Sequence, residues 1–199
     1  FTAALLNSQP MGFYAPAQLV SNAVRHGVKV REIDVAHSDW DCTIERGALR
    51  LGLRLIRGLP QSAAVAIETA RGERAFQSLD DFNRRVRLNR GQLPKLSEAD
   101  AFRSLGHNRR RALWHALAQS ATDGGPRLFD MSAIEDEPPP DLPEMDLQAE
   151  VYADYHSTSL SLRPHPLSFH RRALREMGIT TAAELPKIPK ARLGTVAGL

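Results

Sequence analysis

A run of acidic residues and prolines divides this chain. Between residues 130 and 150 the sequence carries eight Asp or Glu and no Lys or Arg, and Pro138, Pro139, Pro140 and Pro143 fall in the same stretch. Like charges repel, and proline removes the backbone donors that helices and sheets need. We therefore predict an extended linker over residues 121–150, with a larger folded part before it and a smaller part, residues 151–199, after it.

The composition is that of a globular protein that does not cross a membrane. Of the 199 residues, 42% are hydrophobic and 25% are charged. No apolar run approaches the roughly 20 residues of a membrane-spanning helix. The single cysteine, Cys42, cannot form an internal disulfide, and no Cys/His set has zinc-site spacing, so we expect a reducing, cytoplasmic location. Because the chain begins at Phe1 without a signal or transit sequence, we predict a piece of a longer protein.

Hydrophobic periodicity predicts a mainly α chain with a small β element. Helices are expected at residues 1–6, 16–26, 63–70, 78–86, 89–101, 108–118 and 167–177. Alternation over residues 28–35 predicts a strand, and residues 42–53 predict a β-hairpin with its turn at Gly47. Ser78 and Asn108 are expected helix N-caps.

Two segments of the helical region resemble each other. Residues 56–67 and 102–113 align with an offset of 46, and each copy contains a short turn, an expected N-cap (Ser62 or Asn108) and an amphipathic helix. The identical pairs are Arg57/Arg103, Leu59/Leu105, Ala66/Ala112 and Ala70/Ala116. The repeat predicts two similar helical units.

The two copies resemble a tandem helix-hairpin-helix motif, whose turn reads Gly-apolar-Gly with an alanine four residues further on. The first copy keeps Gly58 and has Pro60 at the second glycine position, and its downstream alanine is Ala64. The second copy keeps Gly106, and with this offset Arg110 stands in place of the alanine. The resemblance implies binding of duplex DNA without regard to sequence.

The chemistry of such turns favours phosphate. Glycine lets backbone N–H groups approach an anion, and the following helix presents its positive N-terminal end. Residues 71–129 carry twelve Lys or Arg against six Asp or Glu, which suits a polyanion. We expect DNA contacts from Arg57, Gly58, Leu59, Ser62, Arg103, Gly106, His107, Asn108, Arg109, Arg110 and Arg111. The alternative is a helical bundle whose basic face is merely solvated.

Several short sequence segments resemble segments of the bacterial C-family DNA polymerases, the class of the polymerase III α subunit. They are LLNSQPMGFY at residues 5–14, RHGVKVR at 25–31 and LGLRLIRGL at 51–59. The words SDWDCTIE at 38–45 and YHSTSLSLRPHPLSF at 155–169 are similar to those of the error-prone, damage-tolerant branch. The replicative branch is the neighbouring alternative.

This resemblance implies a domain arrangement. Residues 1–50 would end the fingers domain, residues 51–120 would form the tandem helix-hairpin-helix domain, and residues 151–199 would be a connector leading into a truncated OB fold. The family's catalytic palm, with its Mg²⁺-binding aspartates, lies upstream, so we expect no catalytic residue, no metal ligand and no cofactor in this chain. The implied partners are primer-template DNA, a sliding clamp and translesion accessory proteins.

Other interpretations stay open at this point. His37, Asp39 and Asp41 alternate along the chain and are conceivable metal ligands, although turn chemistry accounts for them more simply. An arginine cluster in residues 84–90 is either a solvated surface or a further DNA contact. At the level of function, the alternatives are a DNA-binding module of a repair nuclease or ligase, and an interaction domain whose acidic linker docks a basic partner.

Overall fold

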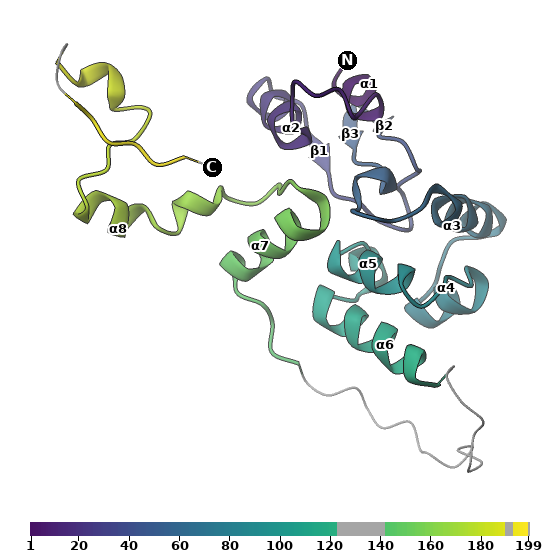
Figure 1. The fold of residues 1–199 in the computed structure, drawn as a ribbon. Helices are drawn as coiled ribbons and strands as arrows, with labels where there is room; N and C mark the ends of the chain where they lie inside the picture. Colours follow the sequence, from purple (N-terminus) through teal and green to yellow (C-terminus); the bar gives the residue numbers. More distant parts are fainter. Residues whose placement is uncertain (123–141, 190–192, 199) are drawn as a thin grey trace.

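The computed structural model describes residues 1–122, 142–189 and 193–198, so most of the predicted linker lies outside the described residues (Figure 1). The structure is mainly helical with a small sheet, as predicted. The helices are α1 (Thr2–Asn7), α2 (Pro16–Arg25), α3 (Gln61–Glu73), α4 (Leu79–Arg85), α5 (Gln92–Glu98), α6 (Arg109–Thr122), α7 (Leu147–Thr158) and α8 (Arg171–Glu176). The strands are β1 (Val30–Arg31), β2 (Thr43–Glu45) and β3 (Ala48–Arg50), and the 3₁₀ turns are η1 (Leu53–Leu55), η2 (Arg103–Leu105), η4 (Pro166–Ser168) and η5 (Leu185–Lys187).

Residue type sets most of the helix starts. Ser78 accepts a hydrogen bond from the Asp81 N–H at 3.1 Å, and Asn108 accepts one from the Arg111 N–H at 2.9 Å, so both predicted N-caps are confirmed. The prediction for Ser62 is wrong. Helix α3 begins at Gln61, two residues earlier than predicted, with Pro60 at the N-cap position, because proline there gives up no helical hydrogen bond.

The sheet has strand order β1-β3-β2. Strands β2 and β3 form the predicted hairpin, with Ile44 opposite Leu49, and its two turn residues, Arg46 and Gly47, both have positive φ. Strand β1 pairs in parallel with β3 but is only two residues long. It ends early because the chain turns away: the Val35 N–H donates to Ala101 O, and the Asp34 carboxylate accepts from the Ala36 N–H.

One hydrophobic core joins the sheet to the helices. Phe82 lies in its centre, with Phe76 and Phe102 edge-on at 5.0 Å between ring centroids. The cluster runs from Leu6 in α1 to Leu160 just after α7. The predicted boundary between residues 50 and 51 therefore falls inside this core.

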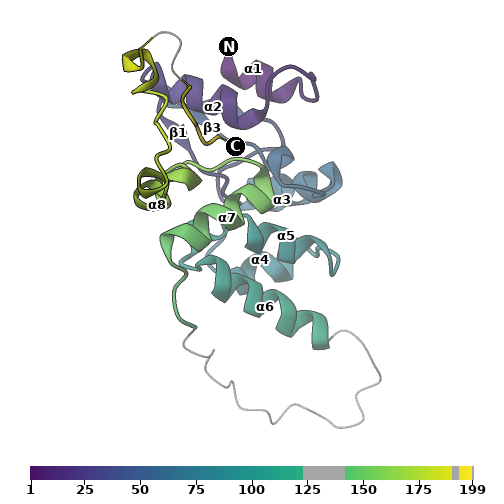
Figure 2. The ribbon, with the colours of Figure 1, turned by 60° about the vertical axis from the view of Figure 1, so that its left-hand side comes forward.

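Helix α7 was not predicted, and it begins inside the range assigned to the linker. Asp146 caps it by accepting from the Ala149 N–H at 2.7 Å, and Val151 is fully buried. Both views place α7 beside α5, between the sheet region and α6 (Figures 1 and 2). The chain from α8 onward extends away from these helices, and Thr180 pairs there with Val196. None of the described helices has the length and apolar character that a membrane crossing requires.

Candidate nucleic-acid interface

Two glycine turns precede the helices of the repeat. We call residues 57–60 the first turn and residues 105–108 the second turn. Gly58 has φ +70° and Gly106 has φ +79°, the left-handed region that glycine enters without strain. Each glycine stands three residues before the first residue of a helix, Gln61 of α3 or Arg109 of α6. The two turns are thus built alike.

The structure corrects the register of the repeat. Gly58 corresponds to Gly106, and the helix starts correspond in the same way, which gives an offset of 48 in place of 46. With this register Ala64 matches Ala112, and both side chains are buried. The alanine that seemed lost from the second copy is therefore present, because chance identities within the helices had favoured the wrong alignment.

Each turn directs the N-terminal end of a helix toward solvent. The first N–H groups of an α-helix have no carbonyl partner within the helix, and the helix dipole makes this end positive. In α3, Gln61 and Ser62 are exposed, and in α6, Arg110 and Arg111 are exposed. This arrangement suits an anion at each turn.

The first turn is bound to elements that lie far away in sequence. The Arg57 N–H donates to Ser157 O at 2.8 Å, and the Arg57 guanidinium donates to Ser159 Oγ at 2.9 Å. Lys95 of α5 donates from Nζ to Gly58 O at 2.5 Å. Leu59 is buried in the core, so it supports the turn and is not available to a ligand.

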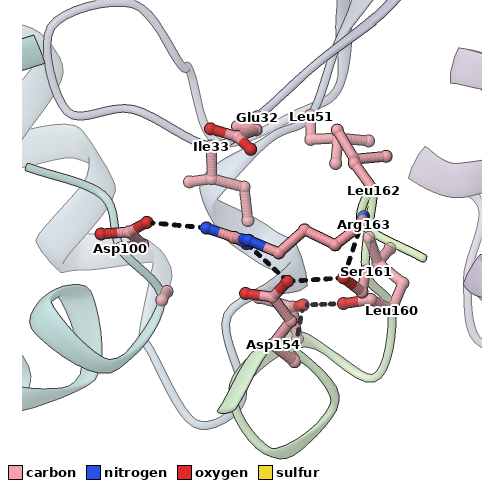
Figure 3. Close-up of a pocket in the computed structure, with 11 residues that line it drawn as sticks. Glu32, Ile33, Leu51, Asp100, Asp154, Leu160, Ser161, Leu162 and Arg163 are labelled. Carbon is pink, nitrogen blue, oxygen red and sulfur yellow. Dashed lines mark hydrogen bonds and ion pairs between the residues drawn. The ribbon is translucent and has the colours of Figure 1, made fainter. Parts of the chain in front are cut away.

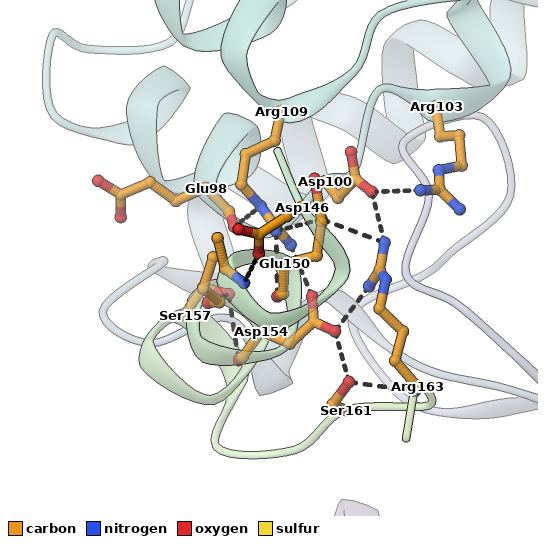
Figure 4. Close-up of polar contacts among 12 residues, drawn as sticks. Glu98, Asp100, Arg103, Arg109, Asp146, Glu150, Asp154, Ser157, Ser161 and Arg163 are labelled. Atoms are coloured by element: carbon orange, nitrogen blue, oxygen red, sulfur yellow. Dashed lines mark hydrogen bonds and ion pairs between the residues drawn. The ribbon is translucent and has the colours of Figure 1, made fainter. Parts of the chain in front are cut away.

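Arg109 is held inside the protein. Its side chain is buried; Nε donates to Glu98 O at 2.8 Å, Nη1 lies 2.5 Å from Glu150 Oε2, and Nη2 lies 2.6 Å from Asp154 Oδ1 (Figure 4). The prediction that Arg109 contacts DNA does not fit this placement. We assign it instead to the packing of α6 against α7.

The carboxylates that bind Arg109 also bind a second arginine. Arg163 donates to Asp154 Oδ2 at 2.6 Å and to Asp100 Oδ2 at 3.2 Å, beside a small cavity of about 30 Å³ (Figure 3). Burial alone would lower the pKa of Arg163, but Asp154 and Glu150 outweigh it and raise that pKa. This ion-pair network fixes α7 against the helices that carry the second turn.

The remaining residues around the second turn differ in accessibility. Arg110 is exposed and donates from Nη1 to Pro143 O at 2.6 Å, and Arg111 is exposed as well. Arg103 forms ion pairs with Glu32 and Asp100. His107 is half-buried, and its ring centroid lies 5.2 Å from that of His115. Burial is the main cause that lowers the pKa of His107, and the neighbouring His115 lowers it further, so the His107 ring is neutral at pH 7.

The conceivable metal ligands do not come together. Asp39 forms an ion pair with Arg71, and Asp41 forms one with Arg54 at 2.6 Å. Within the described parts of the chain, no three His, Cys, Asp or Glu side chains are arranged to hold a metal ion.

The arginine cluster divides into two parts. Arg84 and Arg85 each lie 3.1 Å from the buried Asp81 carboxylate, and Arg85 also stacks over Phe76. Arg87 and Arg90 are exposed. Two of the four side chains therefore belong to a structural ion pair.

Comparison with known proteins finds relatives that match the whole chain. A model of the helix-hairpin-helix motif matches residues 27–112, which include both turns. The whole chain is 47% identical to an error-prone DNA polymerase of Alkalilimnicola ehrlichii, and 43% identical to those of Methylococcus capsulatus and Bordetella parapertussis. It covers 20%, 21% and 19% of these proteins, so it spans about a fifth of the length of the curated relatives it matches. The predicted resemblance to the error-prone branch is confirmed: over its whole length the chain is similar to a segment of error-prone DNA polymerases, and residues 27–112 match the helix-hairpin-helix motif.

Proposed function

We propose that this chain is a DNA-holding part of an error-prone DNA polymerase, and that it binds duplex DNA through the phosphate backbone. The observation that carries the proposal is the pair of left-handed glycines, Gly58 and Gly106, each placed at the start of an exposed helix N-terminus. Two such anion sites on one core suit two phosphates of one duplex. Contacts of this kind position the protein and do not read sequence.

The arginine side chains around the second turn have two different roles. Arg110 and Arg111 are exposed and add attraction to phosphate that weakens with salt. Arg109, by contrast, holds α6 against α7 through Glu150 and Asp154. The positions of the outer arginines therefore depend on an inner one.

The whole polymerase would transfer nucleotides to a primer end. The family resemblance assigns Mg²⁺ and its aspartates to a palm domain, and the described carboxylates here do not fit such a site, because Asp39 and Asp41 are each paired with arginine. This chain would contribute binding and orientation only. Primer-template DNA, a sliding clamp and translesion accessory proteins are the partners we propose for the whole protein, with the cytoplasm as its location.

The test is binding of a fluorescent primer-template duplex, measured by anisotropy at several salt concentrations. Replacing Arg110 and Arg111 together by Ala is expected to lower the slope of log affinity against log salt by about two, since each phosphate contact contributes about 0.9. The matched control removes two exposed cations away from the turns, by Arg25→Ala with Lys29→Ala, and should leave the slope unchanged.

A second candidate is a protein-interaction role. Trp114 and Leu117 of α6 are each about half exposed, and they lie on the same helix as Arg110 and Arg111. An unaltered protein that fails to bind the duplex even at low salt would favour this candidate over DNA binding.

A further inference from the structure

A cleft of about 300 Å³ lies beside the first turn. The first residues of α3 and α6 do not line it, so it differs from the two anion sites proposed above. Its walls come from three elements that are far apart in sequence: Arg57 and Gly58 of the turn, Lys95 and Glu98 of α5, and His156 of α7. The helix-hairpin-helix model matches residues 27–112 and therefore does not include His156. The cleft is thus a composite of the motif and the helix that follows it.

The charges at this cleft favour an anion. Arg57 and Lys95 carry two positive charges against the one negative charge of Glu98, and the His156 imidazole adds a further hydrogen-bonding group. Arg57 is held by its contacts with Ser157 and Ser159, and Lys95 is held by its hydrogen bond to Gly58 O. The cations are therefore fixed at the cleft before a ligand arrives.

Gly58 has a second role here, besides its backbone conformation. A Cβ atom at this position would lie 2.9 Å from Lys95 Nζ, which is closer than side-chain carbons approach other groups. The absence of a side chain lets the Lys95 ammonium reach the turn. One glycine therefore shapes both the turn and the neighbouring cleft.

We propose that this cleft binds a phosphate group, with Lys95 and His156 as ligands in addition to Arg57. The proposal rests on the proposed function where the phosphate belongs to duplex DNA: it would be a further phosphate of the duplex held at the first turn. Free pyrophosphate has the same chemistry and is the other possible source. In either case α7 contributes a side chain directly to the ligand.

The DNA arm of the test uses the whole 199-residue chain and the same labelled duplex. Lys95→Met and His156→Gln are compared with the matched exposed controls Lys29→Met and His26→Gln. Lys95→Met is expected to weaken binding about eightfold at 0.1 M salt and to lower the salt slope by about 0.9, the contribution of one phosphate contact. His156→Gln should weaken binding more than His26→Gln does. Circular dichroism and thermal unfolding exclude variants that fail to fold.

The second arm follows the His156 ring by NMR during titration with sodium pyrophosphate at constant ionic strength, without DNA. Weaker DNA binding by both variants identifies backbone phosphate as the source. If pyrophosphate shifts the His156 resonance, Lys95→Met abolishes this shift, and both variants bind DNA as their controls do, the source is free pyrophosphate. Variants that match their controls in both arms overturn the inference. Loss of DNA binding by the unaltered chain would instead contradict the proposed function.

Discussion

Gly52 shows how much one residue can constrain this fold. It lies between β3 and η1, where the chain passes against the backbone of Trp40 and Asp41. A Cβ at this position would overlap the Trp40 carbonyl oxygen and the Asp41 carbonyl carbon, neither of which is a flexible side chain. Only glycine allows the two segments to come this close.

Replacing Gly52 with Ala is expected to destabilise the protein by about 1–3 kcal/mol, because the backbone must shift to accept the methyl group. Gly72 is the matched control: it lies in α3, and a Cβ there would meet nothing within 4 Å. Gly72→Ala should therefore stabilise the protein by about 0.5–1 kcal/mol through helix propensity. Thermal unfolding measures both, and equal melting temperatures for the two variants would contradict the role given to Gly52.

At this scale the sequence predicted local chemistry and missed long-range partners. The caps Ser78 and Asn108 are recognisable because a cap bonds to an amide three residues away. Arg109 has a residue type and a place that favour DNA contact. Its partners Glu150 and Asp154 follow 41 and 45 residues later, across the acidic stretch, and no local pattern links them.

At the scale of elements, α4 is held by one buried carboxylate. Asp81 lies 2.8 Å from Arg74 and 3.1 Å from both Arg84 and Arg85. Burial alone would raise the pKa of Asp81, but the Gln77 N–H and the three guanidinium groups outweigh it and lower that pKa to about 2. The carboxylate therefore stays charged in the folded protein under mildly acidic conditions.

This shift predicts a pH dependence of stability. The unfolded-state pKa of aspartate is about 4, above the folded-state value, so the contribution of Asp81 is complete above pH 4 and is lost as the pH falls toward 2. Asp81→Asn should be less stable than the parent at pH 7, and the difference should shrink toward pH 2. Urea denaturation at a series of pH values measures it. Asp80→Asn, at the exposed neighbouring position, should run parallel to the parent, and a parallel curve for Asp81→Asn would refute the assignment.

The elements themselves were predictable where periodicity is strong. The β2–β3 hairpin and the helices between Pro60 and Asn108 follow from alternation, caps and glycine. Helix α7 was missed because its neighbours are acidic and proline-rich, and because its buried face includes Asp154 as well as Val151. A buried aspartate contributes nothing to a hydrophobic pattern, and only its arginine partners explain it.

At the scale of the whole molecule, Arg109 connects α6 to α7, two helices that lie on opposite sides of the acidic stretch in the sequence. Removing one member of a buried ion pair leaves the others uncompensated, so Arg109→Ala is expected to cost about 3–5 kcal/mol of stability. The exposed neighbour provides the control, because Arg110→Ala should change stability by no more than about 0.5 kcal/mol. Urea unfolding measures both, and a small effect of Arg109→Ala would show that α7 is held mainly by apolar packing.

The continuous core limits how this protein can be shortened for experiments. Leu6 and Leu160 belong to the same cluster, although 154 positions separate them. A piece that starts at residue 51 keeps both glycine turns but discards Leu6, Val35 and Leu49, which belong to the same cluster as Leu53 and Ile67. The apolar surface exposed in this way would favour aggregation. Truncation after His170 removes α8 and the residues beyond it without taking a member of that cluster. The useful minimal protein therefore extends from Leu6 to Arg163, and it is much longer than the segment that matches the helix-hairpin-helix motif.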